Sequence, residues 1–220
     1  MFSIGIAKAS GAASVMAADL NDYRLSLAKV MGADDIMAPE DYVEIRAKRR
    51  RIVSEAKRRR RLAVGPDITF YFENYITMLH QVHEMLYIEK GGESQIVDEL
   101  AAYNPLIPQG RELVTTMMIE IDDPHRRARV LAELGGIEKK VRMLIGDENI
   151  AAVAETDVDR TDAAGKTSSI HFLRFPLTDA QIIAFRESGV RVVLVIEHTG
   201  YSHMAIMPDD VRRSLGEDLD

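Results

Sequence analysis

The sequence predicts an α+β fold, with a mixed sheet of about five or six strands, helices packed on the sheet, and a long basic helix near the N-terminus. Two patterns carry this prediction. Up to residue 62 the apolar residues recur at helical spacing. After residue 67, short runs rich in β-branched and aromatic residues alternate with capped amphipathic segments. The length of 220 residues favours a single domain, which we place at residues 19–203.

The long basic helix is predicted to span residues 39–62 as a helical arm of about 33 Å. Pro39 suits a first helical turn, and Gly65 with the following proline stops the helix. Ten of the 28 Lys and Arg residues lie between residues 46 and 61, with Glu55 as the single acidic residue of that run. The chain is therefore an acidic body, of net charge −7 overall, with one strongly basic segment.

The other elements follow from local signals. Asn74 and Thr178 are suited to cap helices, and Gly146 lies in a hairpin connection. Helices are predicted at residues 19–32, 74–90, 96–103, 123–135 and 178–187, and strands at residues 68–73, 112–121, 141–145, 150–154, 169–175 and 190–197.

Both ends of the chain are expected to lie outside the domain. Residues 1–18 are predicted to be a disordered leader, because most of their side chains are small and only weakly apolar. Met16 is an alternative start. Residues 204–220 are predicted to be an acidic tail that includes a helix start at Pro208.

Several classes of function are disfavoured by composition. The chain has no cysteine, which excludes disulfides, a thiol nucleophile and an iron–sulfur cluster ligated by this chain. It also lacks a Walker lysine loop, a dinucleotide glycine fingerprint and a nucleophile elbow. No stretch approaches the ~20 apolar residues of a membrane span. We expect a cytoplasmic protein.

The first candidate site combines Glu73, His80, His83 and Glu84. His80 and Glu84 are four residues apart and share one helix face, and two imidazoles with a carboxylate suit zinc or iron. We therefore predict His80, His83 and Glu84 as a metal-ligand set. The alternative is that both histidines lie on a partly exposed helix flank.

A second candidate site combines His171, Arg174, His198 and Tyr201. Strand alternation places His171 and Arg174 on opposite faces, where each needs a polar partner. If the strands of His171 and His198 are parallel neighbours, these histidines lie about 20 Å apart, and only an antiparallel arrangement brings them together.

The basic helix is the third candidate, with Arg49, Arg50, Arg58 and Arg59 as anion-binding residues. No aromatic residue interleaves with them, so a platform that stacks single-stranded bases is disfavoured. The acidic body would also repel nucleic acid, so we expect binding to be weak. The alternative is a solvated face that pairs with the acidic body of the same chain or of a second copy. We expect a homodimer built through this helix, because so long a helix is hard to bury within one domain.

Four stretches agree in order and spacing with a known bacterial family. They are residues 70–73 (FYFE), 103–108 (YNPLIP), 166–175 (KTSSIHFLRF) and 197–201 (EHTGY). Together they resemble the family catalogued as domain of unknown function 3501, over roughly residues 34–201.

The resemblance implies a cytoplasmic bacterial protein without an assigned activity. Genes for rubrerythrin-like and iron–sulfur proteins lie near those of relatives, which implies a redox or stress-related setting and a partner of that kind. The chain departs from the family in two places. The first concerns the metal set, because relatives more often carry Tyr and Gln at the positions of His80 and His83. The chain also extends past Tyr201, beyond the usual end.

Three functions are consistent with these observations. The first is a non-catalytic accessory or interaction protein. The second is a metal- or ligand-dependent enzyme with Glu73, Glu84, His171 and Arg174 in one polar pocket. The third is a nucleic-acid or anion binder that uses residues 46–61.

Overall fold

A computed structural model describes residues 16–18, 35–37, 39–155, 160–162 and 165–220 of the chain. The chain divides into two compact units, in place of the single predicted domain. The helical unit includes residues 39–56 and 74–109, and the β-unit comprises residues 57–73 and 110–220. The division arises because the chain leaves the β-unit after Glu73 and returns at Gly110, and the inserted helices bury a small apolar cluster of their own.

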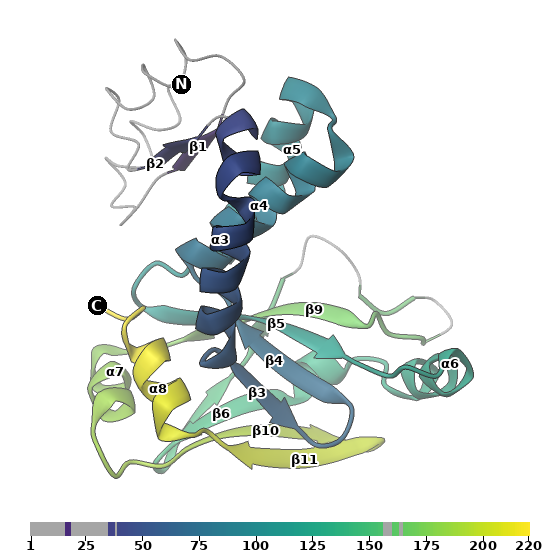
Figure 1. The fold of residues 1–220 in the computed structure, drawn as a ribbon. Coiled ribbons are helices and arrows are strands. Elements are labelled where there is room, and N and C mark those ends of the chain that lie inside the picture. The colour runs from purple at the N-terminus through teal and green to yellow at the C-terminus, as the bar shows by residue number, and fades with distance from the viewer. Residues whose placement is uncertain (1–15, 19–34, 38, 156–159, 163–164) are drawn as a thin grey trace. The chain divides into compact units, whose positions relative to one another are not determined.

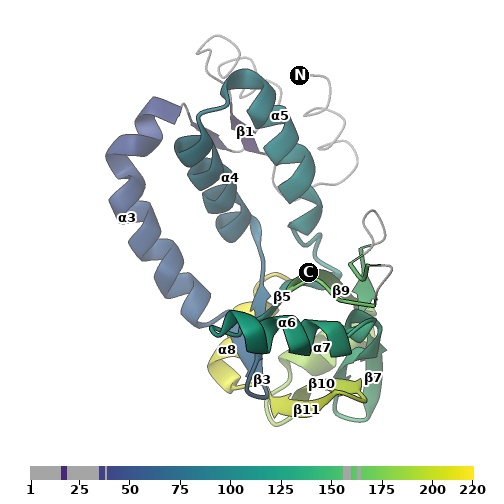
Figure 2. The same cartoon turned by 90° about the vertical axis from the view of Figure 1, so that its right-hand side faces the viewer.

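The helical unit contains α3 (Pro39–Arg58) up to Ala56, α4 (Tyr75–Glu89), α5 (Gly92–Tyr103) and the single turn η1 (Asn104–Leu106). Figure 2 shows α4 between α3 and α5. Asn74 caps α4 as predicted, because its side chain accepts a hydrogen bond from the Thr77 amide while the Thr77 hydroxyl bonds back to the Asn74 amide. Val82, Leu86 and Ile96 form the apolar cluster between α4 and α5.

The N-terminal part of the chain is described at two short strands only. Strands β1 (Met16–Ala18) and β2 (Asp35–Met37) pair in parallel. Residues 16–18, at the end of the predicted leader, therefore form a strand. The helix predicted at residues 19–32 and the rest of the leader lie outside the described residues.

The predicted long helix ends four residues early. Residues 61–64 form strand β3 (Arg61–Val64), in which the buried Leu62 and Val64 alternate with the exposed Arg61 and Ala63. Pairing with the next strand satisfies this backbone and buries both apolar side chains, which outweighs the helical propensity of the basic residues.

The β-unit is built from two antiparallel sheets (Figure 1). The α+β class is therefore confirmed, but the strands form two purely antiparallel sheets and not the single mixed sheet that was expected. The five-stranded sheet has the order β3, β4 (Ile68–Phe72), β5 (Glu112–Ile119), β9 (Ile170–Pro176), β8 (Val153–Ala154). The four-stranded sheet has the order β11 (Tyr201–Ile206), β10 (Val192–His198), β6 (Val141–Ile145), β7 (Glu148–Ala151).

The two sheets are joined at both edges. The predicted strand at residues 150–154 is shared between them, because only Ala152 separates β7 from β8. At the opposite edge the Tyr201 hydroxyl of β11 donates to the Val64 carbonyl of β3 at 2.8 Å and accepts from the Asp67 amide at 3.0 Å. Side chains from both sheets fill one core.

Among its described residues, the β-unit has four helical segments beside the sheets: α6 (Pro124–Glu133), the short η2 (Ile137–Lys140), α7 (Asp179–Arg186) and α8 (Asp209–Gly216). The predicted acidic tail is wrong, because residues 201–206 form β11 and α8 lies beside α7 (Figure 1). Val211, Leu215 and Leu219 recur every four residues and are buried, which turns a strongly charged stretch into part of the core. None of the described helices is long and apolar enough to span a membrane.

Candidate functional site

Glu84 on α4 is held by two side chains of α3. Arg46 donates from Nε and Nη2 to the two carboxylate oxygens of Glu84, both at 2.8 Å, and the Tyr42 hydroxyl donates to Oε1 at 2.5 Å. These hydrogen bonds, chiefly that of Arg46, lower the pKa of Glu84 to about 2. Burial and the adjacent carboxylate raise the pKa of Tyr42. Glu84 is thus a fixed anion near neutral pH and not a proton carrier.

The two histidines of α4 surround the same tyrosine. The Tyr42 hydroxyl lies 3.2 Å from Nδ1 of His80, and the Tyr42 ring stacks on the buried ring of His83 with centroids 4.7 Å apart. Over the described ranges no three His, Asp or Glu side chains are placed to hold a metal ion. The geometry therefore does not support a metal site at His80, His83 and Glu84. The Arg46 guanidinium donates to both carboxylate oxygens of Glu84 and compensates their charge.

The remaining residues of the predicted polar pocket belong to the β-unit. Glu73 is buried at the end of β4 and accepts a hydrogen bond from the Thr116 hydroxyl at 2.8 Å. Arg174 on β9 donates to Glu112 at 2.7 Å and lies 3.9 Å from Glu155, so it has the carboxylate partners that the sequence required. Glu84 lies in the other unit, and a single pocket that unites it with these residues stays a prediction.

His171 faces a buried carboxylate. Its Nε2 lies 2.9 Å from the Ser168 carbonyl and 3.1 Å from the Thr167 hydroxyl, while Nδ1 lies 3.8 Å from Oε2 of Glu138. A carbonyl only accepts, so Nε2 carries a proton. Both His171 and Glu138 are buried, and burial lowers the pKa of His171. Sequence reasoning missed Glu138, which lies in a short helical turn with no motif around it.

His198 and Tyr201 flank the turn between β10 and β11 and pair with each other across it. His198 Nδ1 accepts from the Gly200 amide at 3.1 Å, and Nε2 lies 3.2 Å from the Gly135 carbonyl. Tyr201 joins the sheets as described above. His171 and His198 lie in different sheets, so neither the parallel nor the antiparallel neighbour arrangement considered for them exists.

The predicted anion-binding arginines are divided between the units. Arg49 and Arg50 belong to the helical unit, whereas Arg58 and Arg59 belong to the β-unit. Arg50, Arg58 and Arg59 are exposed. Arg49 is half-buried on the face of α3 that carries Tyr42, and its Nε and Nη2 make no hydrogen bond with the described residues. The spacing of Tyr42, Arg46 and Arg49 by four and three residues was the sequence signal for this shared face.

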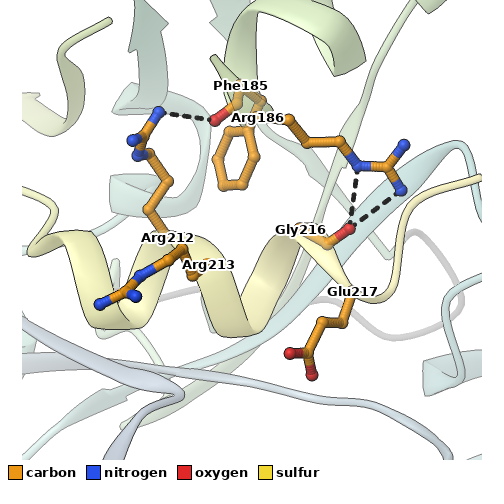
Figure 3. Close-up of a pocket in the computed structure, with 6 residues that line it drawn as sticks. All are labelled: Phe185, Arg186, Arg212, Arg213, Gly216 and Glu217. Atoms are coloured by element: carbon orange, nitrogen blue, oxygen red, sulfur yellow. Dashed lines mark hydrogen bonds between the residues drawn. The ribbon is translucent and has the colours of Figure 1, made fainter. Parts of the chain in front are cut away.

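Two adjacent pockets flank α8 in the β-unit. One, of about 210 Å³, is lined by Phe185, Arg186, Arg212, Arg213, Gly216 and Glu217 (Figure 3). The other, of about 440 Å³, is lined by Arg59, Asp210, Arg213, Ser214 and Glu217. Arg213 and Glu217 border both, so we treat the pair as one feature, the α8 cleft. No motif in the sequence indicated it, because its residues come from three separate segments.

The comparisons with known proteins agree with this fold. The model of a family of proteins of unknown function, DUF3501, matches residues 31–219. The family therefore continues past Tyr201, and the expectation that it ends there was wrong. The chain is similar to the crystal structure of a novel protein of unknown function from Burkholderia pseudomallei K96243, with 38% identity, 85% of this chain and 97% of that chain covered, and a TM-score of 0.78.

A shorter similarity involves an enzyme. Forty residues, 18% of the chain, are 55% identical to L-threonine 3-dehydrogenase of Bacillus licheniformis. The chain spans only 12% of the length of that enzyme. So short a match does not carry an activity across.

Proposed function

We propose that this chain, which belongs to the family of proteins of unknown function DUF3501, is a non-catalytic interaction protein that forms a two-fold dimer through its helical unit. The observation that carries the proposal is the contrast between α3 and α5. One helix exposes cations beside apolar side chains, and the other is acidic and also exposes an apolar side chain.

The exposed part of α3 has the character of a binding surface. Tyr42, Arg46 and Val53 lie on the face that is buried or engaged within the chain. Ile45 and Ile52, two helical turns apart, are 36% and 47% exposed. Lys48, Arg50 and Arg51 are exposed beside them. A stripe of aliphatic side chains flanked by cations suits an acidic partner with an apolar centre.

The complementary surface is α5 of a second copy. Asp98 and Glu99 of this helix are acidic, and Val97 is 67% exposed next to the exposed Asp98. In a two-fold dimer the α3–α5 contact occurs twice, because each chain supplies both helices. This arrangement favours a second copy over nucleic acid, since α5 would repel phosphates close to α3.

The non-catalytic part of the proposal is supported by the sequence-predicted site residues. Glu84 accepts hydrogen bonds from Arg46 and Tyr42, and Arg174 donates a hydrogen bond to Glu112. Each of these charges has an internal structural role. The redox or stress-related setting, and a rubrerythrin-like or iron–sulfur partner, follow from the family resemblance alone and stay predictions.

Light scattering tests the dimer at micromolar concentration. The wild-type protein is expected at twice the 24.6 kDa chain mass. Arg50→Glu with Arg51→Glu makes the α3 variant, and Asp98→Lys makes the α5 variant. Each should dissociate at least about tenfold more readily, because like charges then face each other. The matched control is Lys139→Glu on the exposed surface of the β-unit, which should remain dimeric.

Mixing the two variants gives the decisive result. In the mixed dimer one contact pairs Glu with Lys and the other keeps Arg opposite Asp, so a heterodimer should form from two monomeric proteins. Variants that stay monomeric after mixing, or a wild type that is monomeric and binds duplex DNA at physiological salt, would contradict the proposal.

A further inference from the structure

The α8 cleft is large enough for a small metabolite. Its wider pocket, of about 440 Å³, lies within the range of roughly 300–1,000 Å³ typical of small-molecule sites. The narrower pocket continues it past Arg213 and Glu217. The lining contains four arginines and two carboxylates, so the cleft is strongly polar with an excess of positive charge.

Two of these arginines have donors that no internal group uses. Among the described residues, the Arg213 side chain bonds only through Nε, to the Asp209 carbonyl at 3.2 Å, which leaves both terminal nitrogens available. Arg59 makes no hydrogen bond or ion pair with the described chain, and both side chains are exposed. Guanidinium groups recognise phosphate through paired N–H donors. Ser214 lines the same pocket, and a serine hydroxyl can supply a further donor.

The wall that carries Arg59 is fixed to α8. The adjacent Arg60 is buried and donates to the carbonyls of Phe72 and Glu73, both at 3.1 Å. It also donates to the Ser214 carbonyl at 3.2 Å and forms an ion pair with Asp218. These bonds hold residue 59 beside the helix that bears Arg213 before any ligand arrives, which reduces the ordering cost of binding.

A second observation comes from the narrower pocket. Arg212 is only 6% exposed, and its Nη1 donates to the Phe185 carbonyl at 3.1 Å and to the Glu187 carbonyl. Its Nε is buried and has no hydrogen-bond acceptor in the part of the chain that the structure describes. Figure 3 shows this side chain at the edge of the pocket. A buried N–H on a pocket wall favours a ligand with an oxygen acceptor.

The carboxylates restrict the class of ligand. Asp210 and Glu217 line the wider pocket together with the cations, and they would repel a bare polyanion. They can accept hydrogen bonds from hydroxyl groups. We infer that the α8 cleft binds a hydroxylated phosphate monoester of sugar-phosphate size, with its phosphoryl group on Arg59, Arg213 and Ser214 and its hydroxyl groups on Asp210 and Glu217.

Calorimetry on the full chain tests this site with four probes: glucose 6-phosphate, glycerol 3-phosphate, inorganic phosphate and glucose. The phosphate esters are expected to bind at least tenfold more tightly than inorganic phosphate, and glucose is expected not to bind. Arg59→Gln and Arg213→Gln should each weaken ester binding at least tenfold. The control Arg61→Gln alters an exposed arginine of β3 outside the cleft and should leave binding unchanged.

Substitution of the two carboxylates should reduce the selectivity for esters over inorganic phosphate. Asp210→Asn with Glu217→Gln should narrow the preference for esters over inorganic phosphate to less than about threefold, by relieving repulsion and weakening the hydroxyl contacts. Equal binding of esters and inorganic phosphate by the wild type, no binding of either ester, or ester binding unaffected in a folded Arg213→Gln variant would overturn the inference. The dimer mass measured on the same samples keeps this result separate from the proposed function.

Discussion

Arg186 and Arg212 cap each other's helices. Arg186 of α7 donates to the Gly216 carbonyl at the end of α8, from Nε at 3.1 Å and from Nη2 at 3.0 Å, and to the Leu219 carbonyl beyond it. Arg212 of α8 donates to the Phe185 and Glu187 carbonyls at the end of α7. Each guanidinium therefore satisfies carbonyls at the negative end of the neighbouring helix.

Loss of either cap should destabilise the β-unit. We expect Arg212→Met to lower the free energy of unfolding by about 2–3 kcal/mol, because the carbonyls that it satisfies are partly or fully buried. Arg186→Met should cost about 1–2 kcal/mol. Chemical denaturation followed by circular dichroism measures both, with Arg191→Met at an exposed position as the control. Two variants as stable as the control would show that the caps contribute nothing.

The cross-helix carboxylate predicts a response to acid. The pKa of Glu84 is lowered to about 2 from an ordinary value of 4.5. A carboxylate with a lowered folded-state pKa contributes stability that is present above the unfolded-state pKa and is lost as the pH falls toward the folded-state value. The free energy of unfolding should therefore fall between pH 4.5 and pH 2, and Glu84→Gln should remove part of that dependence. An identical pH profile for the variant would contradict the assignment.

Much of the fold could be predicted because local signals and packing agree. Asn74 and Thr178 cap helices as expected, and the Gly146 connection forms the antiparallel pair of β6 and β7. The failures occur where packing decides between alternatives. Leu62 suits a helix stripe and a strand alternation equally well, and only the pairing of β3 with β4 selects the strand.

The candidate sites were harder to predict for the same reason. His80 and Glu84 were correctly placed on one helix face, but the sequence of α4 contains no sign that Tyr42 and Arg46 would occupy the carboxylate. The α8 cleft joins Arg59, Arg186 and Arg213 from three distant segments. Such a set becomes visible only when the tertiary fold is known.

His171 predicts a second loss of stability on acidification, in this case because the unfolded chain gains a positive charge on the imidazole more readily than the folded chain does. Burial lowers its pKa from 6.5, while Glu138 raises and Arg160 lowers it by smaller amounts. At a pH between the lowered folded-state pKa and the unfolded-state pKa, the unfolded chain binds the proton more readily. The free energy of unfolding should therefore decline as the pH falls below about 6.5. His171→Gln should flatten this part of the profile. At pH 7 nitrogen NMR should show a neutral ring with the proton on Nε2, and a proton on Nδ1 alone would contradict the hydrogen bond to Ser168.

The C-terminal helix is part of the core, which yields the last prediction. Leu215 has an exposed fraction of 0%, although its stretch of chain was expected to be a solvated acidic tail. Leu215→Ala should therefore lower the free energy of unfolding by about 2–5 kcal/mol, through lost apolar burial and the cavity that remains. Glu217→Ala, two residues further along and exposed, is the matched control and should change stability by less than about 0.5 kcal/mol. Urea denaturation of the two variants at pH 7 measures the difference. Equal stabilities would mean that α8 is detached from the core in solution, in which case the reciprocal caps of Arg186 and Arg212 would also be absent.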